Sequence, residues 1–316
     1  MTQETTRHTA QSRLPANVST LLDLACDIAG YPRGSRLLRH FANAVYLLDH
    51  IPVVARVSYT VDAAARARTS LAVVNWLLTQ GFPATEPTTL PSHAAQPVVI
   101  DSDGHEVALT FWRYYPQPAG EPIPDTRVLG RLAHQLHEHP APPVQLREYV
   151  PLRSLSAALA DPASEQALSD QDRDWLQNRL TTLRNVFNEL DFPLGHGFLH
   201  ADLYTGNLLQ DARTPGRVVL GDWDSVATGP REVDLIATYH EPRFGEPVQT
   251  VDAFAETYGY DLRTWPGYQT LYDIRELSTL TALVQLAPRS PTSAKELHHR
   301  LQTLRNGNTT QIWHGQ

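Results

Sequence analysis

The segment His200-Ala-Asp-Leu-Tyr-Thr-Gly-Asn207 decides the fold, because it sets a carboxylate, Asp202, and a neutral amide, Asn207, at a short fixed spacing. Further along, the apolar run Val218-Val-Leu has the composition of a short strand and leads into a second carboxylate, Asp222. Three oxygen-bearing side chains in this order predict a single polar site. The chain continues the pattern with Trp223, Asp224, Gly229, Asp234 and Leu235.

This set of side chains suits phosphoryl transfer, which needs a nucleophilic oxygen in line with a γ-phosphate and cations that neutralise developing charge. Asp202 is the candidate catalytic carboxylate, which would accept the hydrogen bond and finally the proton of an acceptor hydroxyl. Asn207 and Asp222 are candidate ligands of Mg²⁺, a hard ion that prefers oxygen. The alternative is that all three are ordinary residues of a loop, a turn and a strand end. Their compatible spacing favours the functional interpretation.

The same residues resemble the aminoglycoside phosphotransferase family, a branch of the kinase-like fold that also includes choline and homoserine kinases. The family pattern is His-x-Asp-x-x-x-x-Asn, then Ile-Asp-Trp-Glu/Asp, then Gly-x-x-x-x-Asp-Leu, and the chain matches it from His200 to Leu235. Weaker similarity extends from about Asn43 to Leu280. The resemblance implies ATP or GTP and Mg²⁺ as cofactors, and it implies that His200 and Asp234 support the site rather than perform chemistry.

The resemblance also implies a bilobal, protein-kinase-like α+β fold with a small β-rich N-lobe and a larger helical C-lobe. The periodicity of the sequence is consistent with this layout. Apolar spacing predicts helices over 16–29 and 63–79 and strands over 44–48, 52–58, 97–100 and 106–112. Four prolines between Tyr115 and Pro124 predict a connector. Helical spacing returns over 129–136, 176–190 and 271–287, with strand-like 216–220 among them. We therefore expect a flexible tail (1–13), an N-lobe (14–114), a hinge (115–126) and a C-lobe (127–316).

The nucleotide side departs from the usual kinase pattern. Kinases offer a strand lysine to the phosphates, whereas this chain has Arg56 in the corresponding place. Arginine is always charged and bidentate, so Arg56 is a candidate phosphate ligand. The usual glutamate partner is missing, since Thr69 or Ser70 occupies its place. Further nucleotide-binding candidates, implied by the resemblance, are Asn43 and the hinge residues Trp112, Arg113 and Tyr114.

Acceptor choice is the least determined part of the prediction. The chain has 34 Asp and Glu against 26 Lys and Arg, a net charge of -8, which disfavours nucleic acid and tolerates a cationic small molecule. Acidic residues beyond the catalytic loop suggest an aminoglycoside-like or other antibiotic acceptor, and a metabolic amine or sugar is the alternative. Candidate contacts to substrate or metal are Tyr204, Asp224, Asp273 and Glu276.

Two other classes compete with a small-molecule kinase. A protein kinase would need more chain between Asp222 and Asp234 for an activation segment, and an arginine in place of Ala201. A non-catalytic nucleotide-binding pseudokinase would explain the missing lysine–glutamate pair, but not the complete set of base and metal ligands. With one cysteine, Cys26, and no apolar stretch of membrane length, we expect a cytoplasmic protein without a membrane partner.

Overall fold

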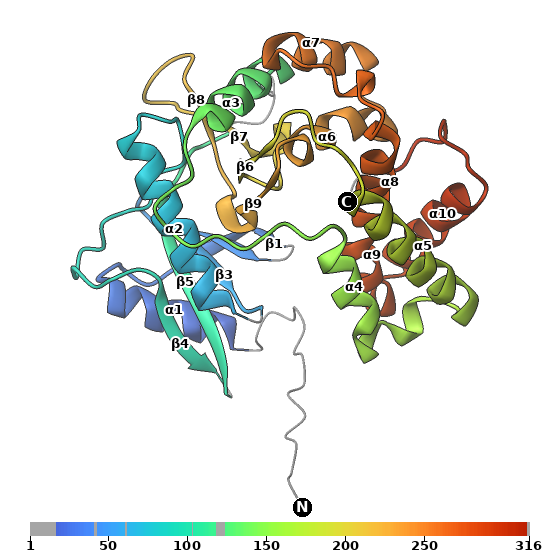
Figure 1. Cartoon of the computed structure of the whole chain (residues 1–316). Coiled ribbons are helices and arrows are strands. Elements are labelled where there is room, and N and C mark those ends of the chain that lie inside the picture. Colours follow the sequence, from blue (N-terminus) through green and yellow to red (C-terminus); the bar gives the residue numbers. More distant parts are fainter. Residues whose placement is uncertain (1–16, 41–42, 61, 103, 118–123, 315–316) are drawn as a thin grey trace, which may run out of the picture. The chain divides into compact units, whose positions relative to one another are not determined.

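The computed structural model describes residues 17–40, 43–60, 62–102, 104–117 and 124–314. The chain divides into two compact units, residues 1–116 and 117–316, and Figure 1 traces their elements. The tail expected over 1–13 lies outside the described residues. So do positions 41–42, next to the nucleotide-binding candidate Asn43, and positions 118–123 of the expected hinge.

The N-terminal unit is built on a five-stranded antiparallel sheet with the order β1-β2-β3-β5-β4. The strands predicted over 44–48 and 52–58 are β2 (Ala44–Leu48) and β3 (Val53–Ser58), and those predicted over 97–100 and 106–112 are β4 (Val98–Ser102) and β5 (His105–Arg113). The sequence did not predict the edge strand β1 (Ser35–His40), which pairs with β2. Arg36 and Arg39 interrupt its apolar pattern, and charged residues are common on an edge strand because they discourage pairing with other chains.

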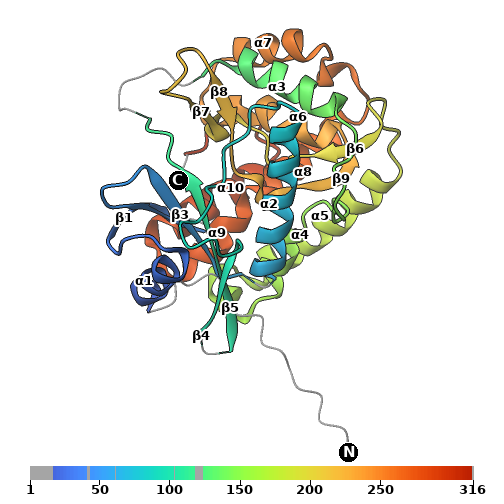
Figure 2. The same ribbon diagram turned by 90° about the vertical axis from the view of Figure 1, so that its left-hand side faces the viewer.

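Two helices accompany this sheet. α2 (Ala63–Thr79) spans the predicted range and packs on β5, as Figure 2 shows. It does so through small buried side chains such as Ala64 and Ala67. α1 (Val18–Ala29) ends at Gly30 with φ +80°, where a Cβ would lie 2.9 Å from the Ser92 nitrogen. Glycine is therefore required at this helix end.

The C-terminal unit is mostly helical, with two two-stranded antiparallel sheets, β6 with β9 and β7 with β8. α3 and α7 pack together in both views of the ribbon. The predicted helical stretch 271–287 is two helices that part at Thr279. The bounds are α3 (Thr126–Glu138), α4 (Arg153–Ala160), α5 (Asp170–Asn188), β6 (His196–Leu199), β7 (Leu208–Gln210), β8 (Val218–Leu220), β9 (Ala227–Pro230), α6 (Glu232–His240), α7 (Val248–Tyr258), α8 (Tyr268–Ser278), α9 (Leu280–Leu286) and α10 (Pro291–Arg305).

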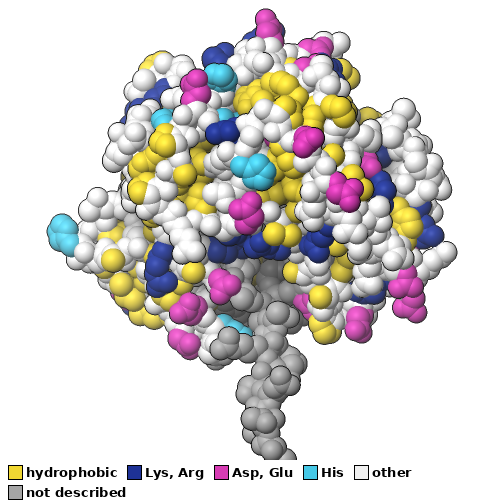
Figure 3. All heavy atoms as spheres, in the orientation of Figure 1, with side chains coloured by type: hydrophobic (Ala, Val, Ile, Leu, Met, Phe, Trp, Pro, Cys, Tyr) yellow, Lys and Arg dark blue, Asp and Glu magenta, His cyan; other side chains and the backbone are white. Residues whose placement is uncertain are grey.

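The surface mixes charges of both signs. Acidic, basic and apolar side chains are interspersed over the face shown in Figure 3.

Ser169 caps α5, because its hydroxyl accepts the Asp172 N–H and donates to the Asp172 carboxylate. Within the described residues, no helix is both long enough and apolar enough to cross a bilayer.

Candidate active site

Asp234, in the first turn of α6, holds the start of the loop that carries Asp202. Its carboxylate is 1% exposed and accepts the His200 N–H at 2.8 Å and the Ala201 N–H at 2.6 Å. The ring of His137 on α3 contacts the same carboxylate at 3.1 Å. Ala201 has φ +61°, a conformation that costs a non-glycine residue about 1 kcal/mol or more. The paired hydrogen bonds from a buried carboxylate offset this cost, and so fix the direction in which Asp202 leaves β6.

The His200 side chain is fully buried and uses both ring nitrogens within the site. Nε2 lies 2.9 Å from the Gly221 carbonyl oxygen, and Nδ1 lies 3.3 Å from the Asp202 backbone nitrogen. A carbonyl only accepts and a backbone N–H only donates, so these partners assign the proton to Nε2 and leave Nδ1 as the acceptor. The ring also packs against Trp223 at 4.6 Å between centroids. His200 is therefore a neutral anchor between the two loops.

Asn207 connects the loop that carries Asp202 to the segment that carries Asp222. Its side-chain Nδ2 donates to the Asp202 carbonyl oxygen at 2.9 Å, and its own backbone carbonyl accepts the Gly221 N–H at 2.9 Å. The first bond uses the amine half of the amide and leaves the oxygen half for another partner. Asp222 follows Gly221 at the end of β8 with φ +61°. The structure thus joins the segments of Asp202, Asn207 and Asp222 through one side chain–backbone and one backbone–backbone hydrogen bond.

The surroundings of Asp202 act on its pKa in opposite directions. Its side chain is 38% exposed, and Oδ1 lies 3.9 Å from Nη1 of Arg275 on α8. Burial raises the pKa of Asp202, the Arg275 charge lowers it, and the nearby Asp222 charge raises it. A carboxylate with increased proton affinity is a better base, while the guanidinium charge favours its ionised form.

The oxygen ligands fit a metal ion whose coordination is completed by phosphates. No group of three or more His, Cys, Asp or Glu capable of holding a metal occurs in the part of the chain that the structure describes. Asp222 and the Asn207 amide oxygen would supply two protein ligands. Mg²⁺ is usually bound in this way, through one or two carboxylates together with substrate phosphates and water.

Two predicted contacts are not brought to this site. On α8, Asp273 pairs with Arg179, and Glu276 pairs with Arg243 at 3.1 Å. Both carboxylates line a separate hollow, whereas Arg275 lines the side of α8 nearest Asp202. Helical geometry explains this separation, because positions that differ by one residue point about 100° apart around the axis.

Asp224 and Tyr204 lie close to the site in the chain. Asp224 sits in the short turn Trp223–Ser225 and is partly exposed. Tyr204 packs over Gly206, where a Cβ would lie 2.3 Å from the tyrosine ring. Gly206 is therefore required for this packing, and contact of either side chain with substrate or metal stays a prediction.

The nucleotide-binding candidates all lie in the N-terminal unit. Arg56 stands in the middle of β3, opposite Val45 on β2 and Thr110 on β5. Asn43 directly precedes β2. The Trp112 side chain is 9% exposed, and its Nε1 donates to the Thr110 hydroxyl at 2.8 Å.

The two remaining nucleotide-binding candidates, Arg113 and Tyr114, lie at the end of β5. The Arg113 guanidinium pairs with Glu86 at 3.1 Å and stacks over Tyr115 at 4.5 Å, so it stabilises the end of β5. The Tyr114 N–H donates to the Pro52 carbonyl oxygen at 2.9 Å, which fixes the backbone where the strand ends.

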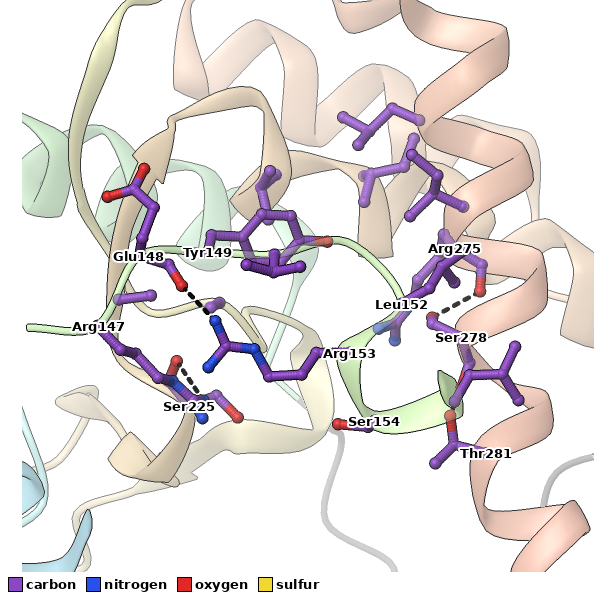
Figure 4. Close-up of a pocket in the computed structure, with 18 residues that line it drawn as sticks. Arg147, Glu148, Tyr149, Leu152, Arg153, Ser154, Ser225, Arg275, Ser278 and Thr281 are labelled. Carbon is purple, nitrogen blue, oxygen red and sulfur yellow. Dashed lines mark hydrogen bonds between the residues drawn. The ribbon is translucent and has the colours of Figure 1, made fainter. Parts of the chain in front are cut away.

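A pocket of about 270 Å³ lies beside the catalytic loop within the C-terminal unit, and Figure 4 shows its lining. Its charged residues are not among those predicted from the sequence. The signal was present for Arg275, because Leu271, Ile274, Arg275 and Ser278 share one face of α8 at helical spacing. Residues that line the pocket include Arg147, Glu148, Tyr149, Arg153, Ala201 and Arg275.

Comparison with known proteins agrees with this fold. The structure is similar to the amicoumacin kinase hAmiN in complex with AMP-PNP, Ca²⁺ and Ami, at 14% identity and a TM-score of 0.65, with 89% of this chain and 91% of that chain covered. It is also similar to a microcompartment-associated aminopropanol kinase at 17% identity and a TM-score of 0.65, covering 93% and 99%. A third similar structure is the choline kinase LicA from Streptococcus pneumoniae, at 13% identity and a TM-score of 0.58, covering 91% and 98%.

The five-stranded antiparallel unit and the mostly helical unit are the two parts of the kinase-like fold of these structures. None of the curated proteins matches the sequence significantly. The family model described as the phosphotransferase enzyme family matches residues 35–271, more than half of the chain. The chain therefore belongs to the phosphotransferase enzyme family.

Proposed function

We propose that the protein transfers the γ-phosphate of ATP, or of GTP, to a hydroxyl of a small molecule in a reaction that depends on Mg²⁺. The observation that carries the proposal is the hydrogen-bonded connection of three segments. Asp234 fixes the loop that presents Asp202, and Asn207 ties that loop to the strand end that presents Asp222. A loop of ordinary residues would have no chemical reason to combine these groups.

Asp202 would act on the acceptor hydroxyl. The hydroxyl oxygen forms a bond to the γ-phosphorus, the bond from that phosphorus to the β,γ-bridging oxygen breaks, and ADP leaves with the bond's electron pair. The hydroxyl proton passes to the Asp202 carboxylate and from there to solvent. Held by Asn207 and Asp222, a divalent ion would supply positive charge to the phosphate oxygens.

The nucleotide assignment has support from one residue of the N-terminal unit and from a similar structure. Arg56 is our proposed ligand of the phosphates, because its guanidinium is permanently charged and suits phosphate oxygens. The similar amicoumacin kinase structure contains AMP-PNP and Ca²⁺, which supports a nucleotide and a divalent ion here.

The similar proteins act on an antibiotic, an aminoalcohol and choline by name, so the acceptor is open among antibiotics, amines and sugars. We place the reaction in the cytoplasm, where ATP is supplied.

A mass-shift screen tests the proposal. The protein is incubated with Mg-ATP and a library of hydroxylated antibiotics, amines and sugars, and products are searched for a gain of one phosphoryl unit. With an accepted compound, Asp202→Asn should lower kcat by about 100-fold or more while nucleotide binding is kept. The matched control is Asp174→Asn on the exposed side of α5, which should transfer at the wild-type rate. Wild-type transfer by Asp202→Asn would refute the role of Asp202.

The alternative is a nucleotide-binding protein without turnover. One observation favours it, since α2 contains no Asp or Glu that could orient Arg56 and presents the buried Ser70 instead. Stabilisation by Mg-ATP in thermal unfolding, together with no ADP formation across the library, would support this alternative over a kinase.

A further inference from the structure

Glu241 contacts the loop that carries Asp202. The Thr205 hydroxyl donates to the Glu241 carboxylate, with 3.0 Å between Oγ1 and Oε1. Both side chains are partly buried. A carboxylate that is partly removed from water needs a hydrogen-bond donor, and this donor belongs to the loop. Glu241 therefore ties the segment that follows α6 to the loop of the candidate active site.

Thr205 is the first residue of the short turn Thr205–Asn207. The Asn207 N–H donates to the Tyr204 carbonyl oxygen at 3.1 Å and closes this turn. Tyr204 precedes the turn and provides no side-chain cap for it. The hydrogen bond to Glu241 thus holds the first residue of the turn, and Asn207, the proposed metal ligand, is its last.

Glu241 and Asp234 stand on the same face of one helix. Glu241 directly follows α6 and keeps a helical conformation, with φ −56° and ψ −33°. The two residues are seven positions apart. Helical geometry then places them on one face, about 10 Å apart along the axis. All residues of α6 are buried, so the helix is a rigid support for both carboxylates.

The two carboxylates hold the loop on opposite sides of Asp202. Asp234 accepts the N–H groups of His200 and Ala201, which come before Asp202 in the chain. Glu241 holds Thr205, which comes after it. The Asn207 side chain also donates to the Asp202 carbonyl oxygen, so loss of the Glu241 contact should loosen the turn rather than release it.

We propose that Glu241 is a positioning residue of the phosphotransferase, which holds Thr205 so that the Asn207 amide oxygen meets the divalent ion. This inference rests on the proposed transfer reaction and adds a residue to its metal-binding part. Nδ2 of Asn207 is fixed on the Asp202 carbonyl oxygen, so the position of the turn sets where the amide oxygen lies. Mg²⁺ demands near-ideal octahedral geometry, and a small displacement of one ligand weakens its binding.

Nucleotide binding with and without metal tests the proposal in the absence of turnover. Calorimetric titration with AMP-PNP or GMP-PNP gives one Kd in Mg²⁺ and another in EDTA, and the ratio of the two isolates the contribution of the metal. Thr205→Val keeps the shape of the side chain and removes the hydroxyl. It should lose about 10-fold of the Mg²⁺-dependent gain in affinity, because a hydrogen bond to a carboxylate is worth about that factor, and it should keep the Kd in EDTA.

The conservative change Thr205→Ser keeps the hydroxyl and should retain the wild-type ratio. An equal ratio in Thr205→Val and wild type would overturn the positioning role and leave the phosphotransferase assignment intact. A wild-type protein whose nucleotide affinity does not respond to Mg²⁺ would instead contradict the proposed function, and this inference with it.

Variants of Glu241 test the other partner of the hydrogen bond. Glu241→Ala should lose the same Mg²⁺-dependent affinity as Thr205→Val, and Glu241→Gln, which keeps an acceptor oxygen, should recover most of it. The double variant Thr205→Val/Glu241→Ala should lose no more than either single variant, since both remove one interaction. Additive losses would contradict the proposal. The matched control is Glu256→Gln on the exposed side of α7, which should bind as the wild type does.

Transfer kinetics separate positioning from contact with the acceptor. With an acceptor found in the screen, Glu241→Ala should need a higher Mg²⁺ concentration for half its maximal rate, while KM for the acceptor is unchanged. A higher KM for the acceptor with an unchanged Mg²⁺ requirement would make Glu241 an acceptor contact and overturn its positioning role.

Discussion

Replacing Arg275 by glutamine should move the acid limb of the pH–rate profile to higher pH. The carboxylate of Asp202 must be ionised to accept a proton, and the Arg275 charge at 3.9 Å favours the ionised form. Removing that charge leaves desolvation and Asp222, both of which raise the pKa of Asp202. The wild-type enzyme should therefore keep activity at a lower pH than Arg275→Gln.

The size of the shift follows from the separation and exposure of the pair. Two unit charges about 4 Å apart interact by about 1 kcal/mol in water and by about 4 kcal/mol at an effective dielectric constant of about 20. The Arg275 and Asp202 side chains are 29% and 38% exposed, so solvent screening places the interaction near the lower end. About 1.4 kcal/mol corresponds to one pH unit, and we expect a shift of about one unit.

The assay is kcat/KM across pH 4 to 9, which reports the ionisation of the free enzyme, with an acceptor that does not titrate in this range. Arg275→Lys is the matched control, because it keeps the charge and should keep the acid limb within about 0.3 units of wild type. A limb that stays in place in Arg275→Gln, or that moves to lower pH, would refute the electrostatic coupling of these two residues.

Three further changes test stability and loop positioning. Burial raises the pKa of Glu276 to about 7 from 4.5, so the native state holds a proton that the unfolded chain releases, and stability should fall as pH rises between these values. In Glu276→Gln, the decrease in the free energy of unfolding between pH 5 and pH 7.5, measured by urea unfolding, should be smaller by about 2 kcal/mol. An equal decrease in the variant and the wild type would contradict this prediction. Ser70→Ala should stabilise the protein by about 1 kcal/mol, because the buried hydroxyl lacks a partner among the described residues; destabilisation would show that it has one. Asp234→Asn should cost about 3 kcal/mol of stability and slow transfer about 100-fold, because an amide nitrogen cannot accept the loop N–H groups; unchanged transfer would exclude its positioning role.

Local patterns carried most of the prediction of the fold. The helix over 63–79 and the hairpin of β2 and β3 were readable because their apolar spacing matches the period of each element. The division of 271–287 into two helices was not predictable from the sequence, because no glycine or proline lies at Thr279 to mark the break. Tertiary packing decides that break, because α8 packs against α5 and α6 whereas α9 packs against α4 and α10. A sequence window holds no information on partners so far away.

The same limit applies to the site. Asp202, Asn207 and Asp222 could be selected because the spacing of two short segments reports their chemistry. The contact of His137 with Asp234 joins α3 to α6, and no pattern in the sequence pairs these two residues. On α8, Asp273 and Glu276 were predicted to contact substrate or metal because they are carboxylates. The face of α8 that lines the pocket instead carries Leu271, Ile274 and Arg275.

Net charge alone does not determine the choice of acceptor, for a physical reason. A total of -8 is a sum over the chain, whereas a ligand responds to the charges within about one Debye length, roughly 8–10 Å in physiological salt. In this protein the acidic residues beyond the catalytic loop mostly pair with arginines or cap turns, so their charge is compensated where it lies. In the pocket, Arg275 lies 3.9 Å from the Asp202 carboxylate, and Arg153 donates to the Glu148 carbonyl oxygen. The pairing of each charged group, rather than the number of such groups, therefore sets what the pocket attracts.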